Sequence, residues 1–296
     1  KNFSKKKVIC VEPCKNVAKV TKRLGYKTFT DFWDINLARK IKRTSKNIDL
    51  IYSANTLSHI SNLDSVFKSI CHVMTDKGIL IIEDPSLLEC LKNVSYDQFY
   101  NEHIYVFSLI SINEVIKKYE LEVFDIEKLN THGGSLRYYI KRISNKRFKK
   151  TIRVKKQLQE EIRFKLNKYD TFVKFKKKVE KSRKNLKQIF YNIKKKGEKI
   201  IGYGATAKAS TVLNYCNIKN ETIDYFLDTT PEKVKKFMPG THIFIEPYNK
   251  KNLYAADYVF LGAWNFKKEI FKKEKNFLKK GGRFITHVPK VMELYK

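Results

Sequence analysis

The segment Lys199-Ile-Ile-Gly-Tyr-Gly-Ala-Thr-Ala-Lys208 carries a short apolar run that leads into closely spaced glycines. The apolar run predicts a buried strand, and residues 205–215 after it predict a helix. Residues 202–207 fit the G-x-G-x-x-A form of the dinucleotide fingerprint, in which backbone N–H groups at a helix start favour an anion such as a pyrophosphate. The segment therefore predicts a Rossmann-like α/β unit at residues 198–296. Apolar patterns in this unit also predict a strand at residues 258–261 and a helix at residues 266–278.

The residues around this glycine turn are candidates for ligand binding. They are Gly202, Tyr203, Gly204, Ala205, Thr206 and Lys208 in the turn itself, together with Asp228. Asp228 ends the next expected strand, residues 223–227, where an acid that binds ribose belongs. Taken alone, this pattern indicates an NAD-dependent oxidoreductase, and the alternative is a tight strand-to-helix turn without a ligand.

The first half of the chain also alternates strand and helix. Apolar runs predict strands near residues 8–11, 26–29, 48–54 and 79–82, and helical patterns lie between them. A helix that starts from a Ser cap is expected at residues 111–119. Residues 122–129 and 137–141 are expected to form a closing antiparallel pair. Such alternation predicts a mostly parallel sheet with helices on both faces, here in a domain at residues 1–143. Residues 144–197, rich in Lys and Arg, are expected to form a helical linker between the two domains.

Polar or aromatic residues follow three successive strands of the first half. Glu12 ends the first strand and can accept both hydroxyls of a ribose. Asp31 and Phe32 follow the second strand, where an adenine would lie, and Asn55 follows the third. These four residues predict an adenosyl site, although a surface Asp or a turn Asn would suit the same positions.

The stretch Asp97-Gln-Phe-Tyr-Asn-Glu-His-Ile-Tyr105 follows an expected buried strand and holds three proton carriers within four residues: Tyr100, Glu102 and His103. Open α/β folds bind ligands beyond the carboxyl ends of their strands, so this cluster is a candidate for proton transfer. His59, beyond Asn55, is a further candidate. The turn at His132 and Gly133 can approach a ligand closely through its backbone.

Composition limits the remaining possibilities. The formal charge is +32, from 62 Lys and Arg against 30 Asp and Glu, and the basic residues are scattered over every expected element. Scattered lysines are typical of solvated faces, so no nucleic-acid partner is expected. A non-catalytic protein that binds an anionic polymer stays an alternative.

The five cysteines have no CxxC pair, which indicates free thiols in a cytoplasmic protein. No apolar run is long enough to span a membrane. The chain starts at Lys1 and close to a strand, which suggests that N-terminal sequence precedes it.

These motifs together resemble the bacterial sugar C-methyltransferases, class I enzymes that use S-adenosylmethionine and act on nucleotide-linked keto-deoxysugars. The resemblance covers nearly the whole chain. It is carried by the following stretches: Val11-Glu-Pro13, Asp31-Phe32, Ala54-Asn-Thr-Leu-Ser-His59, Phe99-Tyr-Asn-Glu-His103, His132-Gly-Gly-Ser-Leu-Arg137, Gly202-Tyr-Gly-Ala-Thr-Ala-Lys208, Leu213-Asn-Tyr215, Asp228, Pro239-Gly-Thr-His-Ile243 and Ala263-Trp-Asn265. The family's four-cysteine zinc domain and its first strand with an acidic glycine loop are absent from this sequence. Zinc is therefore expected only if a missing N-terminal domain exists.

The resemblance implies a fold and a reaction. The fold is an N-terminally truncated class I methyltransferase domain, joined by long helices to a Rossmann-like domain that holds the nucleotide end of the substrate instead of NAD, with Trp264 and Asn265 among its binding residues. The reaction removes a proton next to a ketone, and the enolate then takes the methyl group, without a metal. His103 is expected to act as the base and Glu102 to orient it, while Tyr100 and His59 would hydrogen-bond the ketone or enolate oxygen. Tyr100 as the base stays an alternative. The sugar, the methylated carbon, the nucleotide and the oligomeric state are left open.

Overall fold

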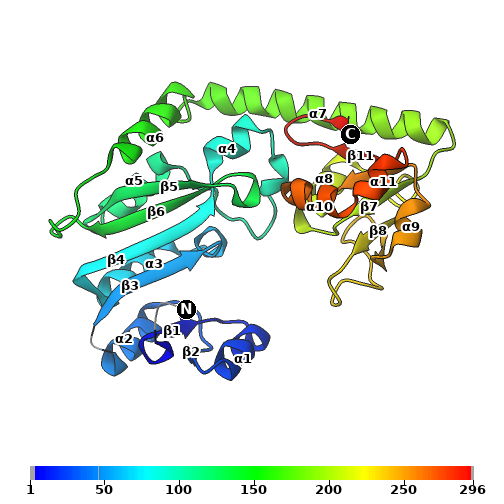
Figure 1. Ribbon diagram of the computed structural model, residues 1–296. Helices are drawn as coiled ribbons and strands as arrows, with labels where there is room; N and C mark the ends of the chain where they lie inside the picture. Colours follow the sequence, from blue (N-terminus) through cyan, green and yellow to red (C-terminus); the bar gives the residue numbers. More distant parts are fainter. Residues whose placement is uncertain (1–3, 46, 295–296) are drawn as a thin grey trace. The chain divides into compact units, whose positions relative to one another are not determined.

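The computed structural model describes residues 4–45 and 47–294, and Figure 1 labels its helices and strands. Packing divides the chain into two compact units. Unit 1 contains the residues up to Glu83 with Ser111–Glu127 and Arg137–Lys155. Unit 2 contains Asp84–Ile110, Lys128–Leu136 and Lys156–Lys296. Packing therefore groups two segments of the expected first domain with the C-terminal residues, and Tyr100, His103 and His132 belong to unit 2.

Unit 1 is built on two sheets. The first pairs β1 (Ile9–Val11) with β2 (Lys27–Phe29) in parallel. The second has the order β3-β4-β6-β5, with β3 (Ile48–Ala54) parallel to β4 (Met74–Pro85), followed by β6 (Ser135–Arg142) and β5 (Leu121–Leu129). The expected strands are present, but within the described residues no strand pairs with the outer edge of β3, which leaves Leu50 and Tyr52 exposed.

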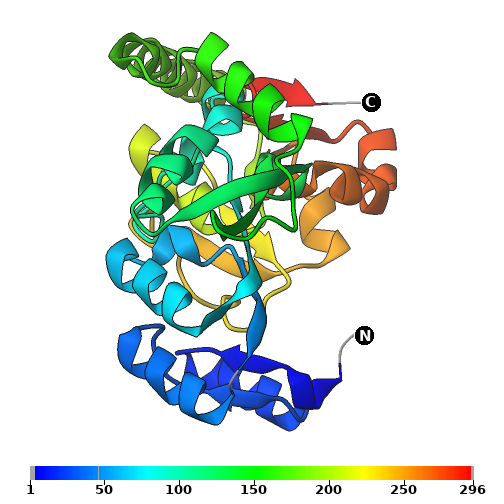
Figure 2. The ribbon, with the colours of Figure 1, turned by 90° about the vertical axis from the view of Figure 1, so that its left-hand side faces the viewer.

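Four helices accompany these sheets: α1 (Lys15–Arg23), α2 (Ile35–Thr44), α3 (Leu63–Val73) and α5 (Leu109–Lys117). Side-chain caps start α2 and α3, because Asp34 accepts the Leu37 N–H at 2.8 Å and Asn62 accepts the Ser65 N–H at 2.9 Å. Helices α2 and α3 lie against each other (Figures 1 and 2). Both bury apolar side chains, among them Leu37, Ile41 and Val66. This contact links the two sheets of unit 1.

Unit 2 holds a six-stranded sheet in the order β12-β11-β10-β7-β8-β9. All neighbours pair in parallel except β12, which runs antiparallel to β11. The strands are β7 (Ile200–Tyr203), β8 (Tyr225–Asp228), β9 (Phe244–Pro247), β10 (Tyr258–Leu261), β11 (Arg283–Thr286) and β12 (Met292–Leu294). The chain leaves β7 toward β8 on one side and returns to β10 on the other, so the switch point of this Rossmann-like sheet lies between β7 and β10.

Helices cover both faces of this sheet. On one face α7 (Tyr169–Lys195) and α8 (Ala207–Cys216) bury Leu186, Phe190 and Val212. On the other, α9 (Lys250–Tyr254), α10 (Lys267–Lys273) and α11 (Lys275–Lys279) contribute to a second apolar cluster. The expected linker is helical, as α6 (Ile152–Arg163) and α7. A short helix, α4 (Leu87–Lys92), precedes the loop that carries His103.

Several elements differ from expectation. Neither β9, α9 nor β12 was anticipated, and the single helix expected at residues 266–278 is divided at Glu274. Helix α5 begins at Leu109, two residues before its expected start, because the buried carboxylate of Glu161 accepts the N–H groups of Leu109 and Ile110, both at 2.9 Å. No described helix is both long and apolar enough to cross a membrane.

Candidate active site

The loop after α4 carries the expected proton carriers. A single turn, η3 (Tyr96–Gln98), places the carbonyl oxygen of Gln98 at 2.8 Å from Nδ1 of His103. Because a carbonyl oxygen can only accept, Nδ1 carries a proton. When the ring is neutral, Nε2 is the acceptor. Nε2 therefore keeps its lone pair and accepts a hydrogen bond from the Tyr100 hydroxyl, at 2.8 Å. The structure thus brings Tyr100 and His103 together.

Tyr100 is held in its protonated form. Burial, followed by the negative charges of Glu102 and Asp97, raises the pKa of Tyr100 above its ordinary value. Glu102 itself is exposed. It acts on Tyr100 through its charge.

The turn at His132 belongs to the same unit as this loop. It forms η4 (Thr131–Gly133), in which His132 adopts a φ of 53°. Its carbonyl oxygen accepts a hydrogen bond from Nε2 of Gln98 at 2.5 Å and lies 3.5 Å from Nζ of Lys208. Gly133 packs against the ring of Trp264. Four residues that were expected to bind substrate therefore lie close together: His132, Gly133, Lys208 and Trp264.

The glycine turn after β7 is shaped by its neighbours. Gly204 has a φ of +82°, and a Cβ there would lie 2.6 Å from the Cβ of Ala263 at the end of β10. Thr206 caps α8 by accepting the Ala209 N–H at 3.1 Å. The fold alone therefore requires glycine at the switch point, whether or not a ligand binds there.

Asp228 is already engaged by backbone donors. Its Oδ2 accepts the N–H of Ala205 at 2.7 Å, and its Oδ1 accepts the N–H of Thr230 at 2.8 Å. In the dinucleotide fold, an acid at this place binds ribose hydroxyls. Here the carboxylate binds the backbone of the glycine turn, and its remaining lone pairs can accept a hydrogen bond from a further donor.

A cavity of about 330 Å³ opens beside this turn. Its walls include the expected residues Tyr203, Gly204, Thr206 and Asp228, and also Lys233, Tyr248, Phe266 and Lys273. The last four were not expected from the sequence; Tyr248 follows a strand that was itself not expected, so no pattern marked it. The hydroxyls of Tyr203 and Tyr248 both donate to the buried Glu274, at 2.9 and 2.7 Å. Hydroxyl, aromatic and cationic groups of this kind suit a nucleoside with an attached phosphate.

Lys208 lies away from the walls of that cavity. It is buried, and burial lowers the pKa of its ammonium group while the charge of Asp97 opposes that shift. Its Nζ lies over the Trp264 ring, 5.4 Å from the centroid. Asn265, the neighbour of Trp264 in η5 (Trp264–Phe266), is half-buried.

The expected adenosyl residues lie in unit 1, at the ends of three strands. Glu12 follows β1 and accepts the Cys14 N–H at 2.8 Å; Asp31 and Phe32, after β2, are exposed. Asn55 follows β3 with a φ of 51°, and its Oδ1 is buried without a hydrogen-bond partner among the described residues. His59, in η2 (Leu57–His59), is exposed. The unsatisfied buried acceptor of Asn55 fits a ligand that brings a hydrogen-bond donor.

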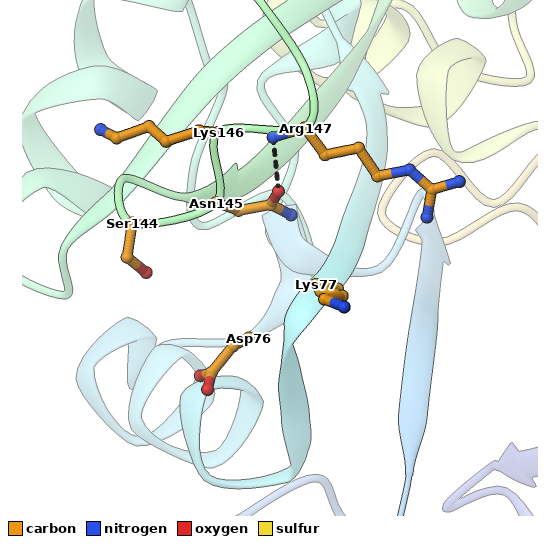
Figure 3. Close-up of a pocket in the computed structure, with 6 residues that line it drawn as sticks. All are labelled: Asp76, Lys77, Ser144, Asn145, Lys146 and Arg147. Atoms are coloured by element: carbon orange, nitrogen blue, oxygen red, sulfur yellow. Dashed lines mark hydrogen bonds between the residues drawn. The ribbon is translucent and has the colours of Figure 1, made fainter.

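A larger cavity, about 600 Å³, lies elsewhere in unit 1 (Figure 3). It is lined by Asp76, Lys77 and residues 144–147. Asn145 accepts the backbone N–H of Arg147 there. None of the expected site residues lines it, and we assign it no role. Across residues 4–45 and 47–294, no group of three or more His, Cys, Asp or Glu side chains is placed to hold a metal ion.

Comparison with known proteins adds independent information. Residues 2–126 match a methyltransferase domain, and residues 130–289 match the C-methyltransferase C-terminal domain. The chain is 28% identical over 283 residues to the C-methyltransferase NovU of Streptomyces niveus, covering 96% of this chain and 67% of that protein.

Two solved structures also share similarity with part of the chain. One is the PH0226 protein of Pyrococcus horikoshii, 16% identical, with a TM-score of 0.35 over 46% of this chain and 71% of the other. The second is a SAM-dependent methyltransferase of Anabaena variabilis, 13% identical, with a TM-score of 0.35 over 46% of this chain and 68% of the other.

The protein is a methyltransferase of the α/β class, with S-adenosylmethionine as its methyl donor. It belongs to the C-methyltransferase family, whose C-terminal domain spans more than half of the chain. This membership confirms the resemblance found in the sequence, and it makes methyl transfer the activity in place of oxidoreduction or non-catalytic binding.

Proposed function

We propose that the protein methylates a carbon next to a ketone on a nucleotide-linked deoxysugar. The observation that carries this proposal is the arrangement at His103. Gln98 holds the proton on Nδ1, so the basic Nε2 points to the Tyr100 hydroxyl. A carbon acid needs a positioned base and a donor for the enolate oxygen, and these two side chains provide both.

His103 is the better base of the pair. The raised pKa of Tyr100 keeps its hydroxyl protonated near neutral pH, where it donates. When substrate binds, the Tyr100 hydroxyl moves from Nε2 of His103 to the ketone oxygen. This exchange uncovers the lone pair of Nε2 for the proton on the neighbouring carbon, and the hydroxyl stabilises the charge that develops on oxygen.

The remaining residues bind and orient. We infer that Glu12, Asp31, Phe32 and Asn55 hold the adenosyl cofactor. S-adenosylmethionine, when bound, supplies an electrophilic methyl group on a sulfonium. His59 is a second candidate donor to the ketone oxygen, and Glu102 tunes the pair through its charge.

The nucleotide end of the substrate is assigned to unit 2. The cavity beside Gly204 offers the hydroxyl of Thr206, the carboxylate of Asp228 and two lysines. The turn of His132 and Gly133 contacts Lys208 and Trp264, and Gln98 joins this turn to the loop of His103. A sugar attached to a nucleotide here would be the acceptor.

The test separates deprotonation from methyl transfer. His103→Asn is compared with His242→Asn, the same change at an exposed histidine of unit 2. Uridine-, thymidine- and guanosine-diphosphate keto-deoxysugars are incubated in D₂O without cofactor, and deuterium uptake beside the ketone is followed by NMR. We expect H103N to lose exchange and methyl transfer by about 10²- to 10⁴-fold, with S-adenosylmethionine affinity unchanged. Normal exchange in H103N would refute His103 as the base, and no turnover of any sugar by the unmodified protein would refute the substrate class.

A further inference from the structure

Three ionisable side chains, Asp97, Lys208 and His287, are buried in unit 2 outside the proposed proton-transfer pair. Together with Trp264 we call them the Asp97 cluster. Asp97 and His287 are fully buried, and Lys208 is nearly so. Oδ2 of Asp97 accepts the indole N–H of Trp264 at 2.5 Å and lies 3.5 Å from Nε2 of His287.

The charge of Asp97 is retained despite its burial. Burial raises the pKa of this carboxyl, but His287, Trp264 and Lys208 together outweigh that effect and hold the pKa below its ordinary value. A buried carboxylate is costly unless its partners are fixed in place. Those partners come from the first turn of α8, from the segment after β10 and from the segment after β11. Asp97 therefore interacts with three separate segments that surround the Rossmann-like sheet.

These interactions act on the residue that sets the tautomer of His103. Asp97 is the middle residue of η3, and Gln98 follows it directly. The carbonyl of Gln98 accepts the Nδ1–H of His103, and its side chain donates to the carbonyl of His132. If η3 shifts, the Gln98 carbonyl leaves Nδ1, and the proton is then free to occupy either ring nitrogen.

We propose that Asp97 is a positioning residue, whose hydrogen bond from Trp264 and close contact with His287 fix η3 so that the Gln98 carbonyl keeps His103 in its Nδ1–H form. The inference rests on the proposed role of His103 as base. All the residues that would fix the tautomer of His103 in this way belong to unit 2.

The experiment reads the tautomer directly. Histidine labelled with ¹⁵N is incorporated, His103 is assigned by the H103N variant, and ring ¹⁵N shifts are recorded without any ligand. The variants are Asp97→Ala and Asp97→Asn. The control is Glu161→Ala, which removes an equally buried carboxylate of unit 2 that holds Leu109 and Ile110 instead of η3.

We expect the Asp97→Ala protein to show mixed His103 tautomers and to lose kcat by about 10- to 100-fold, with KM little changed. Asp97→Asn keeps an acceptor for Trp264 and should restore the single tautomer in large part. Glu161→Ala should lower the stability of the protein but leave the ring ¹⁵N shifts of His103 unchanged. If D97A does not fold, Trp264→Phe removes the same hydrogen bond and should give the same mixed signal.

Two results would overturn the proposal. One is a single Nδ1–H tautomer of His103 in W264F and in D97A where D97A folds, and the other is a mixture of His103 tautomers in E161A. The NMR readout needs no substrate. A failure of the proposed reaction would therefore appear only in the deuterium exchange of the unmodified protein. A failure of the proposed role of Asp97 would appear only in the ¹⁵N spectra.

Discussion

Trp264 covers Gly133 so closely that a Cβ on this glycine would lie 2.1 Å from the indole ring. Gly133 also has a φ of +84°. Two independent constraints thus require glycine at this turn, and both partners were expected to bind substrate.

Gly133→Ala should therefore lower the stability of unit 2 and displace Trp264. Gly197→Ala is the matched control, because Gly197 has a φ of +76° but a Cβ added there would meet no atom within 4 Å. We expect about 1–2 kcal/mol of loss from backbone strain in both variants, and a further loss with a changed Trp fluorescence in G133A alone. Equal unfolding free energies and equal spectra would contradict the packing argument.

Asp228→Asn tests whether this carboxylate holds the glycine turn. The change weakens the hydrogen bonds that this side chain accepts from the N–H groups of Ala205 and Thr230. Chemical denaturation should therefore show that the free energy of unfolding falls by about 1–3 kcal/mol. Asp224→Asn, just before the start of β8, removes only long ion pairs to Lys194 and Lys199 at 3.6 and 3.7 Å. Partly exposed pairs of this kind contribute little, so D224N should stay within about 0.5 kcal/mol. Similar losses in the two variants would show that Asp228 does not anchor the turn.

The depressed pKa of Asp97 predicts an acid-sensitive unit 2. The folded-state pKa lies below the unfolded value, so the charged form stabilises the fold above about pH 4, and this contribution is lost as pH falls through the folded pKa. Urea midpoints measured from pH 6 down to pH 2 should fall less steeply in D97N than in the unmodified protein. Parallel curves would mean that Asp97 does not titrate with folding.

Arg137 offers a comparable test in unit 1. Its guanidinium donates to Glu83 at 3.0 Å and to Glu127 at 2.8 Å, and the side chain of Glu83 is only 8% exposed. Arg137→Met leaves the Glu83 charge buried without its partner, which costs about 3–5 kcal/mol. Arg153→Met breaks a pair whose arginine is 58% exposed, and Asp125 keeps hydrogen bonds from Thr151 and the Ile126 N–H, so the loss should be smaller, about 1 kcal/mol. Calorimetric scans of both variants give the comparison, and an R137M protein as stable as R153M would argue against a buried ion pair.

Local patterns in the sequence were sufficient for most secondary structure. The strand at β10 was expected with its observed bounds, and α2 and α3 start where Asp34 and Asn62 supply caps. The start of α5 could not be found this way, because its cap is Glu161, about fifty residues away in the chain. The division of the last long helix at Glu274 also involves distant residues: this buried carboxylate accepts the hydroxyls of Tyr203, at the end of β7, and of Tyr248, just after β9.

The sequence by itself determined the two α/β patterns, the glycine turn after β7 and the short segment that contains Tyr100 and His103, because these depend on neighbouring residues and on the period of apolar side chains. Only the tertiary structure decided that Nδ1 of His103 faces a carbonyl, that Asp228 binds the backbone of the glycine turn, and that Asp97 meets Trp264 and His287. The contacts of Asp228 and Asp97 join residues far apart in the chain, and the contact of His103 depends on how its own loop folds. Their partners are chosen by burial and hydrogen-bond geometry, which no local pattern encodes.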